Sequence, residues 1–174
     1  MLQIITKYKP SVIGKVKIVK VAKGTAIPIY STNNVITNEM PEFLTGGPTY
    51  DYTHIYGQWG SQVNFAEGGG PYFTAQNTDT VADLTTATIS TGNAEIPITY
   101  RVRTTQTGQS SFTYNILTLM ALMTANNDGV YVGAGLVCQA DNKELLLTHV
   151  AFPGFLKRSF FDLMIIWDLI FSNS

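Results

Sequence analysis

The chain has 174 residues, of which 45% are hydrophobic and only 13% are charged, whereas an average soluble protein has about 25% charged residues. This length fits one domain, and the scarcity of charge beside many β-branched and aromatic residues favours an all-β fold whose surface meets other protein. A single cysteine, Cys138, excludes an internal disulfide. The first residues contain no continuous apolar stretch, so no signal peptide is expected.

The N-terminal part of the chain is strongly basic. The first 38 residues carry six lysines and no acid, whereas five basic and twelve acidic side chains follow, which leaves the remainder at −7. The basic residues of this segment are Lys7, Lys9, Lys15, Lys17, Lys20 and Lys23. We interpret residues 1–35 as a basic strand or arm that precedes a domain spanning residues 36–174.

The stretch from Val12 to Ala22 alternates lysines with β-branched residues, which predicts a strand with Lys15 and Lys17 on its solvent face. Two interpretations stay open: an edge strand protected from unwanted pairing by lysine, or an arm that docks on an acidic neighbouring subunit. Nucleic-acid binding is not expected, because the segment has no arginine and no base-reading motif. On the arm hypothesis, removal of residues 1–24 would leave a folded domain that no longer enters its assembly.

A short helix is predicted near residues 38–47, where Asn38 or Glu39 could cap it and Gly46-Gly47 ends it. An aromatic-rich section follows from Thr49 to Phe73. Its Tyr56 and Trp59 are candidates for stacking on sugar rings or for a protein–protein contact, and the alternative is that these aromatics form a strand face in the core.

The middle of the chain combines a polar loop with a β-hairpin. Residues 74–93 are threonine-rich and indicate a long loop with a weak strand at 86–90. Residues 96–103 alternate as a strand, and Pro97 suggests an edge or a strand start. The return strand begins at Phe112, and residues 116–125 fit either a short helix or a continued strand.

Three apolar segments close the chain and determine the fold class. Residues 130–138 and 145–152 form a predicted hairpin, in which Gly133 and Gly135 suggest a bulge or the close approach of another backbone. In the last segment, Phe160 to Phe171, one face is wholly hydrophobic and the other carries Asp162 and Asp168. This period of two predicts a core strand, which has to be covered by the rest of the chain or by a second copy.

No residue is assigned a catalytic, cofactor-binding or metal-binding role, and the chain is not expected to be an enzyme. The two histidines, His54 and His149, lack a nearby histidine or cysteine partner. A metal site with Asp51 would have to be assembled across the fold. The glycines at 68–70 are not followed by the lysine and hydroxyl residue of a phosphate loop.

Several short motifs resemble the attachment domains of bacteriophage tail-collar and tail-fibre proteins. They are Thr37-Asn38 with Leu44, Thr53-His54-Ile55 with Gly57, Gly135-Leu136, Phe152-Pro153 and the final stretch from Trp167 to Asn173. The resemblance implies a virion protein. The basic segment before Val35 and the section between Gly57 and Glu95 depart from the family pattern, which favours a small collar, neck, tail, head-fibre or decoration component.

We therefore predict an antiparallel β-sandwich with one or two short helices, acting as a structural subunit of a phage particle assembled in the host cytoplasm. Expected partners are other virion proteins and further copies of the chain, with a host-surface glycan as another candidate. Neither a cofactor nor a membrane is expected. The alternative function is a carbohydrate-binding module that uses Tyr56 and Trp59.

Overall fold

The structure is a computed structural model that describes residues 11–41, 62–67, 74–86, 92–107, 113–124, 128–140 and 143–172. The strands are β1 (Ser11–Ala22), β2 (Thr25–Asn33), β3 (Val35–Ile36), β4 (Gln62–Glu67), β5 (Gly92–Thr107), β6 (Thr113–Met123), β7 (Gly129–Ala140), β8 (Lys143–Lys157) and β9 (Asp162–Ser172). A short helix, α4 (Val81–Thr86), precedes β5, and residues 39–41 form a helical turn.

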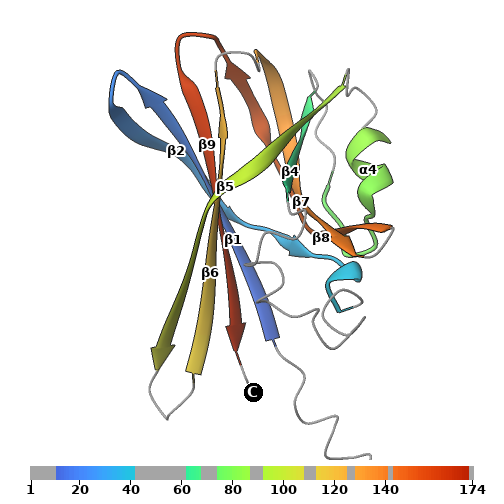
Figure 1. Cartoon of the computed structure of the whole chain (residues 1–174). Helices are drawn as coiled ribbons and strands as arrows, with labels where there is room; N and C mark the ends of the chain where they lie inside the picture. Colours follow the sequence, from blue (N-terminus) through green and yellow to red (C-terminus); the bar gives the residue numbers. More distant parts are fainter. Residues whose placement is uncertain are drawn as a thin grey trace, which may run out of the picture.

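The strands are hydrogen-bonded antiparallel in the order β2-β1-β9-β6-β5-β4-β7-β8-β3. Strand β5 belongs to two layers, because Gly92–Pro97 pairs with β4 and Ile98–Thr107 pairs with β6. It runs diagonally between the layers in Figure 1. We name the layer of β2, β1, β9, β6 and the end of β5 sheet A, and the layer of β5's beginning, β4, β7, β8 and β3 sheet B. The predicted all-β, sandwich-like fold is confirmed.

Strand pairing is nested along the chain. Strand β1 pairs with β9, β3 with β8, β4 with β7, and β5 with β6. The chain is thus arranged as one long hairpin that folds over on itself, with its two ends side by side in sheet A. Most of these contacts join residues far apart in sequence, so the fold depends on long-range pairing.

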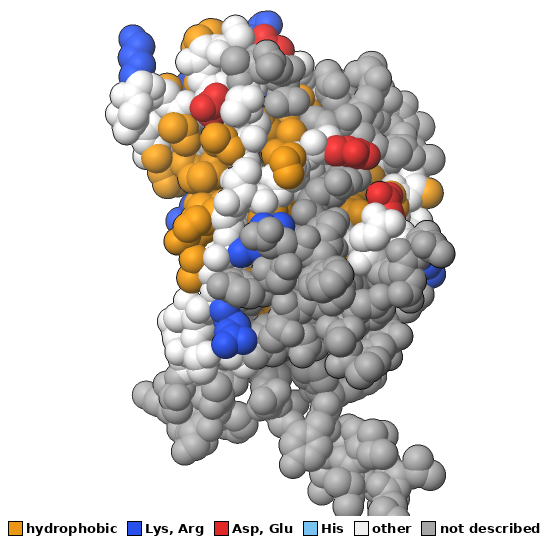
Figure 2. Space-filling view, viewed as in Figure 1, with side chains coloured by type: hydrophobic (Ala, Val, Ile, Leu, Met, Phe, Trp, Pro, Cys, Tyr) orange, Lys and Arg blue, Asp and Glu red, His pale blue; other side chains and the backbone are white. Residues whose placement is uncertain are grey.

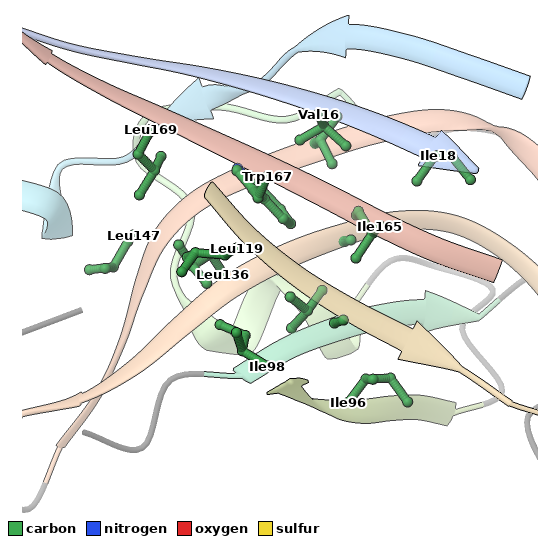
Figure 3. Packing of buried hydrophobic residues seen from close by; sticks show 14 of the residues in the cluster. Val16, Ile18, Ile96, Ile98, Leu119, Leu136, Leu147, Ile165, Trp167 and Leu169 are labelled. Carbon is green, nitrogen blue, oxygen red and sulfur yellow. The ribbon is translucent and has the colours of Figure 1, made fainter. Parts of the chain in front are cut away.

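Strand β9 lies at the centre of sheet A and supplies the middle of the core. Its odd-numbered residues from Phe161 to Phe171 are all buried, and the Trp167 side chain has no exposed surface. Leu136 and Leu147 of sheet B meet them from the other layer (Figure 3). The predicted face assignment of this strand is confirmed, because Met164, Ile166 and Ile170 lie on the opposite face and are only half-buried.

Helix α4 covers the outer side of sheet B. Its Leu84 packs in a buried cluster with Val137 and Leu146. A Cβ atom added to Gly135 would lie 2.5 Å from Cδ1 of Leu146 and 2.8 Å from Cδ2 of Leu84. The absence of a side chain at Gly135 therefore lets the helix approach the sheet, and the register of β7 and β8 shifts between Tyr131 and Gly133. The bulge was one of the two alternatives expected from the glycines, whereas the close approach at Gly135 is to the side chains of Leu84 and Leu146 and not to another backbone.

The prediction of a separate N-terminal arm is wrong for its described part. Strand β1 lies between β2 and β9, and its Val16 and Ile18 belong to the core. The interpretation of β1 as an edge strand is also wrong, since it is paired on both sides. Its lysines do alternate as predicted: Lys15 and Lys17 are exposed between buried residues.

The middle of the chain differs from the sequence prediction in two places, and a third segment decides between two predicted alternatives. Residues 81–86 form helix α4 instead of loop, and residues 62–67 form a strand that was not predicted. Residues 116–123 continue strand β6, which resolves the choice between helix and strand. Pro97 is accommodated within β5 because pairing with β6 begins only at Ile98, so its neighbour there is β4 alone.

Ile165 and Ile166 provide a matched test of the two faces of β9. Replacing the buried Ile165 with alanine should lower the free energy of unfolding by about 2–5 kcal/mol, since it leaves a cavity in the core. Ile166→Ala should lower the free energy of unfolding by only about 1 kcal/mol, which is the spread of β-strand propensities among residue types. Urea unfolding of the two variants in dilute solution measures both values, and equal losses would contradict an open outer side of sheet A.

The position of β1 also predicts the effect of truncation. A chain that begins at Thr25 lacks Val16 and Ile18 and leaves the backbone of β9 unpaired on one side. We expect this truncated protein to lose the cooperative thermal transition of the full chain, measured by circular dichroism. A sharp transition near that of the full chain would show that β1 is dispensable, as the arm hypothesis requires.

Candidate protein interface

The outward-facing side of sheet A carries many large apolar side chains. We call it the outer face, and it is formed by Ile13, Lys15 and Lys17 of β1, Asp162, Met164, Ile166, Asp168 and Ile170 of β9, Ile116, Thr118, Met120 and Leu122 of β6, and Tyr100 and Val102 of β5. Figure 2 shows hydrophobic side chains gathered on the left of the molecule, over this sheet. Helix α4 lies on the opposite side, against sheet B (Figure 1).

Strand register sorts the outer face into rows that cross the sheet. Ile13, Ile170 and Ile116 lie opposite one another in one row, and Ile166, Met120 and Tyr100 form a second apolar row. Side chains at opposed positions of neighbouring strands contact each other. The outer face therefore groups its large apolar side chains into rows, and the second row continues on β1 with Lys17 opposite Ile166.

One polar row separates these apolar rows. Lys15 lies opposite Asp168, which in turn lies opposite Thr118. The Thr118 hydroxyl donates a hydrogen bond of 2.6 Å to Oδ1 of Asp168. This bond fixes the carboxylate at the centre of the sheet and satisfies one of its acceptors.

Apolar residues of the outer face keep much of their surface accessible. Ile13 is 51% exposed and Tyr100 is 50% exposed, whereas Ile18 of β1 and Ile98 of β5 on the inner face are buried. Contiguous exposed apolar patches larger than a few hundred Å² are rare on monomeric proteins and mark interaction sites. The outer face thus has the chemical character of a protein–protein interface.

The predicted basic residues do not converge on one site. Lys15 and Lys17 are exposed on the outer face, but Lys20 faces the other side of β1, where its Nζ lies 4.4 Å from the centre of the Phe161 ring. Lys23 occupies the β1–β2 turn with a positive φ of 50°, next to Gly24. Lys7 and Lys9 lie outside the described residues, as do Tyr56 and Trp59 with the carbohydrate site predicted on them.

His149 forms a buried pair with Asp79 on the outer side of sheet B. Its Nδ1 lies 2.6 Å from Oδ2 of Asp79. The same carboxylate oxygen accepts a 2.7 Å hydrogen bond from the backbone N–H of Gln76. Burial lowers the pKa of His149 and outweighs the hydrogen bond and negative charges of Asp79 and Asp83, which raise it. A neutral His149 with its proton on Nδ1 donates to the carboxylate and ties the chain ahead of α4 to β8.

This pair borders a shallow cleft of about 300 Å³. The cleft is lined by Asn33, Val35, Thr74, Ala75, His149, Val150 and Ala151. His149 is 1% exposed and is hydrogen-bonded to Asp79, so its position fits a structural role in holding the chain. A metal site that joins His149 with His54 and Asp51 would involve two residues outside the described part of the chain.

Reactive groups in the described residues are few. No group of three or more histidine, cysteine, aspartate or glutamate side chains there could hold a metal ion. Cys138 is buried in the core, where burial raises the pKa of its thiol. It is the small core residue that its apolar strand predicted.

The sequence contains a signal for the outer face, on which the expectation rests that the last strand is covered by the rest of the chain or by a second copy. Strand β9 is apolar on both faces, since Met164, Ile166 and Ile170 accompany its core residues, and such strands are typically buried on both sides. The contributions of β5 and β6 depend on strand order and could not be read locally. Asp79 was missed because 70 residues separate it from His149.

Comparison with known proteins gives no relative: no family model, no curated protein and no solved structure matches the chain. Among the described residues, no helix is long and apolar enough to cross a membrane.

The buried His149 predicts a pH dependence of stability. Because its folded-state pKa lies below the ordinary value of 6.5, the unfolded chain takes up a proton first, and stability is lost as the pH falls below about 6.5. Between about pH 7 and pH 5 the free energy of unfolding should fall by up to about 1.4 kcal/mol per pH unit from this group. Urea titrations across this range measure the slope.

His149→Asn is the matched control, because its amide can still donate to Asp79 but does not titrate. Its slope over the same pH range should be shallower than that of the wild type. A wild-type protein that gains stability on acidification would show that pairing with Asp79 outweighs burial.

Proposed function

We propose that this protein is a structural subunit of a bacteriophage particle and that it works by binding other protein through the outer face of sheet A. The observation that carries the assembly part of this proposal is the apolar character of the outer face, where Ile13 and Tyr100 are about half exposed. Exposing such a surface to water costs about 25 cal/mol per Å² of apolar area relative to its burial. Covering the face with another polypeptide would recover that free energy.

The polar groups of the outer face support protein recognition over nonspecific adhesion. Lys15, Lys17 and Asp168 place charges of both signs among the apolar rows. Charged groups in an interface fix register and reject wrong partners more than they add affinity. Lys15 and Lys17 thus remain candidate contacts to an acidic neighbour, as predicted, although they belong to a sheet and not to an arm.

Two edge strands are poorly suited to assembly. Strand β2 is an edge of sheet A, but Pro28 lies within it and its pairing with β1 contains a bulge. Strand β3 at the edge of sheet B has only two residues. Prolines, bulges and short strands hinder the addition of a further strand at these two positions.

The virion part of the proposal is supported by the resemblance of the short motifs to tail-collar and tail-fibre attachment domains. In that setting the protein would be a collar, neck, tail, head-fibre or decoration component. The carbohydrate-binding alternative depends on Tyr56 and Trp59, and no observation on the described residues favours it.

Incorporation into particles tests this proposal with a single outer-face substitution. Ile13→Lys places a charge at a position that is 51% exposed in the single chain, so it should fold normally and yet be depleted at least about tenfold from purified particles. Quantitative mass spectrometry of gradient-purified particles measures the depletion. Glu144→Lys, at an exposed position of β8 in sheet B, is the matched control and should be incorporated like the wild type.

Two results would refute the proposal. The wild-type protein could be absent from the particles, which would remove the virion role. Alternatively, a folded Ile13→Lys protein could be incorporated at the wild-type level, which would remove the role of the outer face.

A further inference from the structure

We infer that the polypeptide covering the outer face is a second copy of this chain, packed sheet on sheet about a two-fold axis. This inference rests on the proposed function, because it names the partner of the same surface. Three properties of the outer face favour a copy: its side-chain relief, its size and its charge balance.

The relief of the outer face suits a sheet as partner. On sheet B, Gly135 allows Leu84 of a helix to approach the strands closely. On the outer face of sheet A, by contrast, the central strands β6 and β9 carry large residues such as Ile166, Met120 and Ile170. Sheets packed face to face stay about 10 Å apart, with their side chains interdigitated. A partner of the same shape, with its own row of large side chains, matches this spacing.

The size of the outer face matches that of a stable dimer. Strands β6 and β9 have 11 residues each, which corresponds to a length of about 37 Å. The four strands of the outer face, spaced at about 4.8 Å, give a width of about 19 Å, so the face covers roughly 700 Å². Standard protein–protein interfaces bury about 800 Å² on each partner. One face against its copy is therefore sufficient without a further surface.

The charges of the outer face also fit a copy. Lys15 on β1 lies opposite Asp168 on β9, and Lys17 and Asp162 add one charge of each sign to the same face, so the face has no net charge from these residues. A strongly acidic or strongly basic partner would meet repulsion as well as attraction. A second copy brings the same balanced set, and a two-fold contact is self-complementary, with each residue pair occurring twice.

Sedimentation equilibrium of the purified full-length chain tests this inference. The wild type should show a concentration-dependent monomer–dimer equilibrium. Ile13→Lys and Tyr100→Lys should each weaken dimerisation by about 100-fold or more, because each buries an unpaired charge in the contact. These two positions lie on different strands and are about half exposed in one chain, so thermal unfolding should confirm that both variants fold. Glu144→Lys should dimerise like the wild type.

Three outcomes would overturn the inference: a monomeric wild type at all concentrations, an oligomer that persists in both variants, or an assembly larger than a dimer. A monomer that still enters particles through the outer face would refute the second copy alone. A face-dependent dimer that is absent from particles would refute the virion role alone.

Discussion

The fold depends on the register of β9, which lies between β1 and β6 and carries Trp167 into the centre of the core. A slip of one residue would exchange Trp167 for Asp168 and would put a carboxylate between the two sheets. The desolvation of that charge makes the slipped register costly. The Thr118 hydroxyl stabilises the correct register from the other side, since it binds Asp168 on the outer face. Core packing and outer-face polarity thus specify the same alignment.

The outer sides of the two sheets differ in how they are covered. Sheet B is covered by its own chain: Leu84 of α4 packs at Gly135, and the pair of His149 and Asp79 holds the residues ahead of the helix. No described element packs in this way on the outer face of sheet A. The backbone of β1, β9 and β6 is hydrogen-bonded to a strand on either side, and a surface that is already ordered loses little conformational entropy when it binds.

Local alternation was sufficient to predict strands β1 and β5 to β9, but not the strands β2, β3 and β4 or the order in the sheets. In β9, the charges of Asp162 and Asp168 against an apolar face determine both period and orientation, so this strand could be assigned with its buried side. In β1, Lys15 and Lys17 point outward whether the strand is at an edge or in the middle, so its pairing with β9 was not predictable. Helix α4 is marked only by Leu84 and by the Thr80–Asp83 capping contact within a threonine-rich stretch. The outer face combines β1, β5, β6 and β9, and hence only the strand order reveals it.

The polar row through Lys15, Asp168 and Thr118 explains how an apolar face can be specific. A face of hydrophobic rows alone would slide along a partner with little change in buried area. A row of fixed charges interrupts this surface at one level, so that displacement by one residue pair would bury Asp168 or Lys15 against apolar side chains at a cost of several kcal/mol. The same groups that set the register of β9 within the sheet would then also set the register of the sheet against its partner, which confines recognition to surfaces that offer polar groups at the matching level.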